Sequence, residues 1–295
     1  MAEYNRKPYD IDMSKYTFAQ LYERWCQTEL PSMSIDMQQA RRAAYGHCQP
    51  LYDMVYKDIR KHHLQAVIDG CKKGSSTQSN VKRLLAALDN YAYDNDIISK
   101  RYSVNLSTVK IESDAKRVPF TDAEVLLLHQ HEGEPYIDET LFLLYTGCRV
   151  LEMLLLKCED IDLEQGVFRG GIKTAAGKNR IIPIHDCLLP VIKRHMNGGA
   201  LFGYEVNPAA VNPTSNMRTD FIRKWSKAMS ELGLVHTTHD CRHTVRSKLD
   251  GKANKVCIDL IMGHKSADVG ERIYTHKTIE ELKETIKILS YGFVR

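Results

Sequence analysis

The chain has 295 residues, of which 43% are apolar, so it is long enough and apolar enough to form two well-packed domains. It has no run of about 18 or more apolar residues and no apolar segment near its start, which predicts neither a membrane span nor a secretion signal. The net charge of +4 is uneven: residues 1–100 hold 14 basic and 12 acidic side chains, residues 101–117 hold four and two, and residues 118–295 hold 23 of each. This excess of positive charge in the first 117 residues weakly favours a polyanionic partner.

The eight cysteines are scattered along the chain and form no Cys-x-x-Cys pair. Such spacing is typical of reduced thiols in a cytosol, and not of a disulfide framework or a zinc site. The sequence therefore predicts a cytoplasmic protein without a structural metal.

The first hundred residues predict a helical domain over residues 16–98. The stretch TFAQLYERWCQTEL has Thr17 as its N-cap and places four apolar side chains on one helical face: Phe18, Leu21, Tyr22 and Trp25. Helical patterns also occur in IDMQQARRAAYGHC, in MVYKDIRKHHLQAVIDGC and in TQSNVKRLLAALDNYAYDND. Together they predict four or five packed helices.

Residues 99–117 are polar and basic and lack an apolar period, which predicts an extended linker. Regular structure resumes at VPFTDAEVLLLHQH, where Thr121 and Glu124 form a capping box. The apolar stretch ETLFLLYTGCRVLEMLLLKCEDIDL predicts a helix that is interrupted at Thr146 and Gly147.

The remaining elements predict a mainly α fold with a small β-sheet. The clearest strand signal is GVFRGGIKTAAGKNRIIPI, which reads as two short strands on either side of the turn TAAGKN. A further helix carries Phe221, Trp225 and Met229 at helical spacing. A tail helix over residues 278–289 carries one apolar stripe, made of Ile279, Leu282, Ile286 and Leu289.

Chemistry-bearing residues occur in five short motifs in the second half of the chain. YTGCRVLEML contains Arg149 and Glu152, GGIKTAAGKNRIIPI contains Lys173, HTTHDCRHTV contains His239 and Arg242, MGHKS contains His264, and RIYTH contains Tyr274. An arginine in a stretch as apolar as the one around Arg149 would be costly without a partner, which favours a functional role.

These groups match the chemistry of phosphodiester cleavage by a phenol. The attack builds negative charge on two non-bridging oxygens, which Arg149 and Arg242 could each bind in a bidentate manner. Losing one such donor typically costs about 10²–10³ in rate. The histidines titrate near neutrality, so they can donate hydrogen bonds or move protons.

In this order the motifs resemble those of the tyrosine recombinases, the family of phage and conjugative-transposon integrases, over about residues 16–290. The resemblance implies that Tyr274 is the nucleophile of a 3′-phosphotyrosyl intermediate and that Lys173 is the general acid. It implies that Arg149, His239, Arg242 and His264 act on the phosphate, and that Glu152 orients Arg149. His243 and His276 are expected to be supporting residues.

Two assignments have rivals in the sequence. Lys178 and Arg180 are basic residues near Lys173, and Tyr291 is a second tyrosine in the tail, although far from the motif. The interval from His264 to Tyr274 is ten residues, one more than is common in the family, and the extra residue is expected near Gly270.

The resemblance also implies the domains, partners and cofactors. Residues 1–15 would be a connector, 16–98 a helical core-binding domain that contacts DNA, 99–117 a basic linker, 118–277 a mixed α/β catalytic domain and 278–295 a tail helix. The partners would be double-stranded DNA at core-type sites, three further copies in a tetramer that forms on DNA from monomers, and an accessory excisionase or DNA-bending protein. The sequence has no P-loop and no acidic cluster for two magnesium ions, so no cofactor or metal is expected.

Several alternative functions are compatible with the sequence. The chemistry also suits a Xer-like dimer resolvase, which acts on chromosomes or plasmids, and a type IB topoisomerase, while a non-catalytic DNA-binding regulator could share the fold. The expected location is the bacterial cytoplasm, at the nucleoid.

EYNRKPYDID resembles the connector that follows an arm-site-binding domain in such integrases, which leaves both a removed domain and a naturally arm-less protein open. The tail helix is expected to dock on a neighbouring protomer rather than on its own domain, because such tails can do so in the family.

Overall fold

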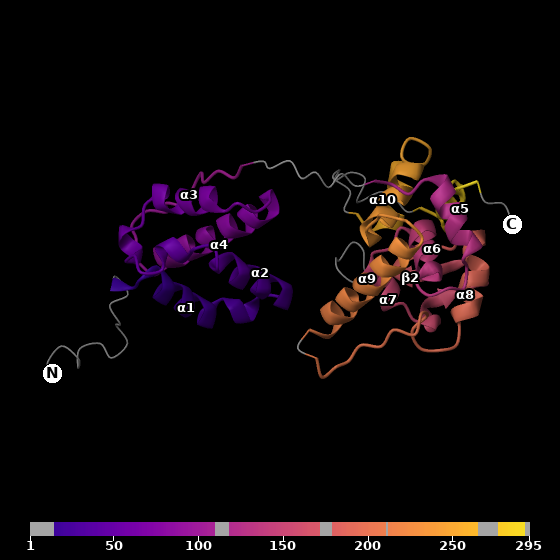
Figure 1. Ribbon diagram of the computed structural model, residues 1–295, viewed down its shortest axis with the longest axis horizontal. Helices are drawn as coiled ribbons and strands as arrows, with labels where there is room; N and C mark the ends of the chain where they lie inside the picture. Colours follow the sequence, from indigo (N-terminus) through magenta and orange to yellow (C-terminus); the bar gives the residue numbers. More distant parts are fainter. Residues whose placement is uncertain (1–14, 110–117, 172–178, 211, 265–276, 293–295) are drawn as a thin grey trace. The chain divides into compact units, whose positions relative to one another are not determined.

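The computed structural model describes residues 15–109, 118–171, 179–210, 212–264 and 277–292, and the chain divides into two compact units, residues 1–116 and 117–295 (Figure 1). We call these the first unit and the second unit. In the part of the chain that is described, no helix is both long and apolar enough to cross a membrane.

The first unit is helical, as predicted. Its α-helices are α1 (Phe18–Thr28), α2 (Ile35–Tyr45), α3 (Lys61–Gly70) and α4 (Ser75–Asp94), with 3₁₀ turns at Leu30–Ser32, Gln49–Leu51 and Tyr56–Asp58. The long helix α4 packs against each of the other three helices. The predicted apolar face of α1 is buried, and Thr17 caps this helix in a capping box with Gln20. The predicted apolar face of α1 is therefore confirmed.

One predicted helix of the first unit is shorter than its pattern suggests. The stretch 54–71 begins with a 3₁₀ turn, and its α-helix starts only at Lys61, because Ile59 and Arg60 have extended backbones. Tyr56 and Ile59 are both buried, and Val55 forms a β-bridge with Thr17. Burial of this turn against the start of α1 overrides the helical pattern.

Part of the predicted linker packs on the first unit. Leu106 is buried in that unit's core. The backbone N–H groups of Ser103 and Val109 donate to Asp89 and Gln78, two buried side chains of α4, at 2.6 and 3.0 Å. Residues 99–109 are thus attached to the first unit by backbone-to-side-chain hydrogen bonds, which leave no apolar period in the sequence.

The second unit surrounds the fully buried helix α6 (Ile137–Thr146). The other helices are α5 (Asp122–Gln130), α7 (Val150–Leu154), α8 (Leu189–His195), α9 (Pro213–Glu231), α10 (Thr238–Leu249), α11 (Lys255–Met262) and α13 (Ile279–Lys287), with 3₁₀ turns at Cys158–Asp160 and Asp186–Leu188. Helices α5 and α10 pack directly on α6. The two acidic side chains of α6 are buried as well, and each has a partner: Arg194 donates to Asp138 and Tyr204 donates to Glu139.

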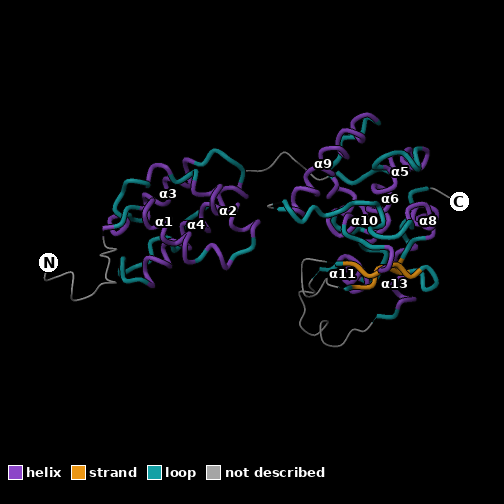
Figure 2. The backbone as a smooth tube through the Cα atoms, turned by 90° about the horizontal axis from the view of Figure 1, so that it is seen from below, coloured by secondary structure: helices purple, strands orange, loops and turns teal. Residues whose placement is uncertain are grey.

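The sheet of the second unit has three antiparallel strands in the order β1 (Ile161–Asp162), β2 (Val167–Gly170) and β3 (Arg180–Pro183) (Figure 2). In its register, Phe168 pairs with Ile182. The two predicted strands are confirmed. The third, β1, has two residues and is too short to show an alternating pattern. The mainly α fold with a small sheet is therefore as predicted.

The expectation that the tail docks on a neighbouring protomer is wrong for the described residues. Helix α13 packs against β3 and α11 of its own unit, and Leu282, Ile286 and Leu289 belong to that unit's core (Figure 2). The following Tyr291 is fully buried, and its hydroxyl donates to the Leu144 carbonyl at 2.8 Å. The apolar stripe is thus a core element of this chain.

Candidate active site

Arg149 stands at the break between α6 and α7. Helix α6 ends at Thr146, and Gly147 takes the left-handed conformation, with φ of 64°. A side chain at Gly147 would be blocked, because a Cβ there would lie 2.7 Å from the sulfur of Met262. Arg149 then caps α7, and its N–H donates to Glu152 Oε2 at 3.0 Å. The break places the Arg149 side chain at the surface, where it is 34% exposed.

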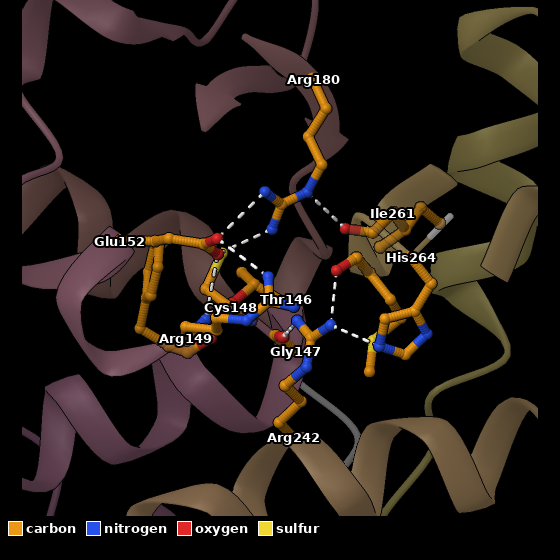
Figure 3. A network of polar contacts seen from close by, with 11 residues as sticks. Thr146, Gly147, Cys148, Arg149, Glu152, Arg180, Arg242, Ile261 and His264 are labelled. Carbon is orange, nitrogen blue, oxygen red and sulfur yellow. Dashed lines mark hydrogen bonds and ion pairs between the residues drawn. The ribbon is translucent and has the colours of Figure 1, made fainter. Parts of the chain in front are cut away.

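Arg242 is a buried guanidinium on α10 that connects three parts of the second unit (Figure 3). It donates to the carbonyl of Gly147 at 2.6 Å, to the carbonyl of Met262 at the end of α11, and to Nε2 of His264 at 2.8 Å. Burial, and then the nearby Arg149, lower the pKa of Arg242 to about 10. Arg242 is therefore still a cation at neutral pH, and its orientation is fixed.

The contact with Arg242 determines the state of His264. A guanidinium has no acceptor, so Nε2 of His264 must accept and carries no proton. The other ring nitrogen, Nδ1, lies 3.6 Å from Oδ1 of Asp259. Burial and Arg242 both lower the pKa of His264. At neutral pH His264 is therefore a neutral imidazole with its proton on the side of Asp259.

Glu152 binds two arginines at once. Its carboxylate accepts from Arg149 at 3.2 Å and, in a bidentate pair at 2.8 and 3.3 Å, from Arg180 at the start of β3 (Figure 3). Burial opposes the charge of Glu152, but Arg180 and then Arg149 hold the pKa of this carboxyl below its usual value. Glu152 is therefore ionised, and it links Arg149 to the hairpin.

Arg180 extends the same network to the loop that carries His264. Its Nε donates to the carbonyl of Ile261 at 2.8 Å, and its side chain passes over Gly263. Gly263 has φ of 64°, and a Cβ on it would lie 3.2 Å from the Arg180 guanidinium. The glycine of the MGHKS motif is thus required both by its backbone conformation and by Arg180.

A surface cavity of about 260 Å³ opens where these elements meet. It is lined by Cys148, Arg149, Val150, Leu151, Arg218, Ile222, Thr238, His239 and Arg242. His239 is exposed and lies one helical turn before Arg242 on α10. Every ionisable group on this lining except the Cys148 thiol is basic, and burial raises the pKa of that thiol to about 11. The cavity therefore suits an anion.

Five of the seven predicted site residues lie together around this cavity or directly behind it: Arg149, Glu152, His239, Arg242 and His264. Lys173 and Tyr274 lie outside the described residues, as do Lys178, His276 and Gly270. His243 does not line the cavity, and its Nδ1 lies 3.5 Å from the Ser247 hydroxyl.

The structure removes two of the rivals. Tyr291 is buried, and burial raises its pKa well above the ordinary value, so it cannot act as a nucleophile. Arg180 is buried and bound to Glu152 and Ile261, so it cannot move over a substrate as a general acid must.

Sequence reasoning missed the role of Arg180 as a link and the place of Arg218 on the cavity. The alternation of a strand puts Arg180 on the same face as Ile182, but only the structure shows that this face is buried and that Glu152 lies beside it. No comparable signal marks Arg218, whose helix shows only the period of its apolar face.

Comparison with known proteins agrees with this geometry. The sequence model of the phage integrase family matches residues 116–281. Tyrosine recombinase XerA of Pyrococcus furiosus is 31% identical over 156 residues, which are 49% of this chain and 51% of XerA, so the chain spans about half the length of this relative.

Among solved structures, the Tn1549 transposon integrase in complex with circular intermediate DNA superposes with a TM-score of 0.64 at 20% identity, over 91% of this chain and 98% of that chain. A lambda integrase tetramer bound to a Holliday junction superposes with a TM-score of 0.66 at 17% identity, over 90% and 81%. These similarities show the fold, and the family match covers more than half of the chain. The chain belongs to the phage integrase family.

Proposed function

We propose that this chain is a site-specific DNA recombinase of the integrase type, which cuts and rejoins strands of a mobile element and its target. The observation that carries the proposal is the basic cavity on which Arg149 and Arg242 meet, with His239 on its lining and His264 bound to Arg242. Two guanidiniums on one small cavity match the two non-bridging oxygens of a phosphodiester.

In the proposed reaction, the Tyr274 phenolate oxygen attacks the scissile phosphorus and displaces the 5′-oxygen of the next nucleotide. A 3′-phosphotyrosyl bond forms as the P–O5′ bond breaks, and the leaving oxygen takes a proton from Lys173. Arg149 and Arg242 stabilise the charge that develops on the phosphoryl oxygens, and His239 donates a hydrogen bond to one of them. Attack by a 5′-hydroxyl on the phosphotyrosine reverses these steps and rejoins the strands.

The side chains around the cavity are already held in position, so little free energy is needed to reorganise the site during the reaction. Arg242 is oriented by two backbone carbonyls, and Arg149 by Glu152. Preorganised donors of this kind are the largest single contribution in many enzymes. His264 supplies Arg242 with a further acceptor, and the segment that bears Tyr274 follows His264 directly in the sequence.

We extend the proposal to the partners and the location. The substrate is double-stranded DNA at core-type sites, and four copies assemble on it; the similar fold of the lambda integrase tetramer on a Holliday junction supports this arrangement. Residues 16–98 act as the core-binding domain and residues 118–277 as the catalytic domain, and both bind the duplex. An excisionase or a DNA-bending protein assists, and the protein acts at the nucleoid of a bacterial cytoplasm.

A suicide substrate tests the chemistry. In such a DNA the nicked end diffuses away after cleavage, so a covalent protein–DNA adduct accumulates. The wild-type chain should form the adduct, and Tyr274→Phe should not, although its DNA affinity should be nearly unchanged because phosphate contacts carry most of the binding. An adduct that forms normally with Tyr274→Phe, or none with the wild type, would refute the proposal.

A DNA substrate with a 5′-bridging phosphorothioate distinguishes the role of Lys173 from that of Arg149. Its sulfur leaves without a proton, so this substrate should rescue Lys173→Ala and should not rescue Arg149→Ala. Equal rescue of both variants would exclude Lys173 as the general acid. A plasmid with two sites then distinguishes recombination products from simple relaxation, and integration between molecules from resolution of dimers.

A further inference from the structure

Arg218 is a third guanidinium on the cavity of the proposed active site. It lies on α9, whereas Arg149 precedes α7 and Arg242 lies on α10, and all three side chains line the same cavity. Arg218 belongs to none of the five motifs. Its place on the cavity follows from the packing of α9 against α7.

The Nε–H donor of Arg218 is buried and has no acceptor among the described residues. A buried donor that loses its water without gaining a partner destabilises the protein, so native proteins rarely leave one. The other two arginines differ, because Arg149 donates to Glu152 and Arg242 to two carbonyls. Four other buried atoms of the described residues, among them Nε of Arg41, also have no partner, but of the five side chains Arg218 is the one that lines this cavity. The missing acceptor and the place on the cavity together point to a ligand.

The lining of the cavity indicates what that ligand is. Beside the three guanidiniums and His239 it has a short apolar strip formed by Val150, Leu151 and Ile222, and none of its described lining residues is a carboxylate. Ile222 is 37% exposed, one of a few large apolar side chains of this unit that are open to solvent. Anionic groups joined by a weakly polar ring have this pattern, and the DNA backbone, phosphate–deoxyribose–phosphate, is such a chain.

We propose that Arg218 binds a non-bridging oxygen of the phosphate next to the scissile phosphate in the cleaved strand. The proposal rests on the proposed function, in which Arg149 and Arg242 occupy the oxygens of the scissile phosphate. Arg218 is then left for the neighbouring phosphate, and the deoxyribose between the two lies against Ile222 and Leu151. Two consecutive phosphates held from three helices would fix the strand in both position and direction.

The test compares variants on suicide substrates in which single phosphates are neutralised. The variants are Arg218→Met, which keeps the length and removes the charge, and Arg223→Met as the matched control. Arg223 lies on the same helix but is 72% exposed, pairs with Asp220 and does not line the cavity. The substrates carry a methylphosphonate at either neighbour of the scissile phosphate or at a remote position.

Arg218→Met should slow adduct formation on unmodified DNA by about ten- to hundredfold, the usual effect of losing a hydrogen bond between charged groups. One of the two neighbouring methylphosphonates should slow the wild type by a similar factor and should leave Arg218→Met unaffected. The remote methylphosphonate should show no such coupling. Arg223→Met should behave as the wild type on all substrates.

The proposal would be overturned if the reductions in the rate of adduct formation from Arg218→Met and from each methylphosphonate were independent, so that the combined reduction equals their product. It would also be overturned if Arg218→Met and Arg223→Met had equal rates. If Arg218→Met does not fold, Arg218→Lys replaces it. Lysine keeps the charge and lacks the second donor, so the same coupling should appear at reduced size, and its absence would be equally decisive.

A binding measurement separates this proposal from the proposed function. The logarithm of the affinity for plain duplex DNA falls with the logarithm of salt concentration, by about 0.9 for each phosphate contact. Arg218→Met should reduce this slope by about 0.9 even if the wild type forms no covalent adduct. An unchanged slope would refute the role of Arg218, whereas a missing adduct would refute only the recombinase chemistry.

Discussion

Arg242 is bound by the carbonyls of Gly147 and Met262 and by His264, so the geometry of its planar fork is essential. A lysine would keep the charge but could not reach these acceptors and a phosphate together. We expect Arg242→Lys to slow adduct formation by about 10²-fold or more. The control is Arg246→Lys, one turn further along α10, which can keep its ion pair with Asp259 and does not line the cavity. Similar rates for the two variants would show that charge alone is enough at Arg242.

The protonation of His264 is a second prediction at this scale. Its pKa is lowered in the folded chain, so the folded state binds this proton less readily than the unfolded state does. This difference makes the protein less stable as pH falls below about 6.5, the ordinary pKa of histidine, and it has no effect well above that value. Nitrogen NMR at pH 7 should show a neutral ring protonated at Nδ1, with His264→Gln identifying the signal. A ring protonated at Nε2 would contradict the contact with Arg242.

At the scale of elements, the pair of Arg180 and Glu152 joins the hairpin to α7. Removing the arginine in Arg180→Met leaves a buried carboxylate whose one remaining ion-pair partner among the described residues is Arg149. Breaking a buried pair in this way costs about 3–5 kcal/mol in the free energy of unfolding. Denaturant unfolding at pH 7 measures the loss, and Lys157→Met, which breaks an exposed pair with Glu159, is the control.

The pH dependence of this loss gives a sharper test. In the wild type the depressed pKa of Glu152 contributes stability above the ordinary pKa of glutamate, about 4.3, and that contribution is lost as pH falls. In Arg180→Met burial should raise the pKa of Glu152, so that acid neutralises it and relieves the penalty. The difference between wild type and variant should therefore shrink as pH falls from 7 towards 4. A difference that does not depend on pH would mean that the two side chains do not interact as ions.

How far the sequence predicts this molecule varies from one element to the next. The apolar periods of α1 and α9, the caps at Thr17 and Thr121 and the break at Gly147 are local signals, and each is confirmed. The attachment of residues 99–109 and the reach of Arg180 to Ile261 depend on partners far along the chain. Such contacts follow from tertiary packing, which no local pattern encodes.

The docking of the tail helix also depends on tertiary packing that its local pattern does not encode. Three of the four predicted stripe residues, Leu282, Ile286 and Leu289, are in the core, whereas Ile279 is not. A stripe does not specify the surface that it covers, and here that surface belongs to the same unit. Leu282→Ala should lower the free energy of unfolding by about 2–5 kcal/mol, as for other buried leucines. Glu284→Ala, on the exposed side of α13, is the control. An unfolding transition that shifts with protein concentration, or an unaffected Leu282→Ala, would return the tail to a role between protomers.

For the whole molecule, the proposed function predicts that both units bind one DNA duplex. The excess of positive charge lies in the first 117 residues, while the second unit places the guanidiniums of Arg149, Arg218 and Arg242 on the cavity. Both units should therefore contribute phosphate contacts, each adding about 0.9 to the slope of log affinity against log salt. We expect the full chain to bind a core-type site with a steep slope and to protect backbone positions of the duplex from hydroxyl radicals. Arg218→Met should lose protection only next to the cleavage point. Affinity that does not change with salt would contradict phosphate contacts from both units.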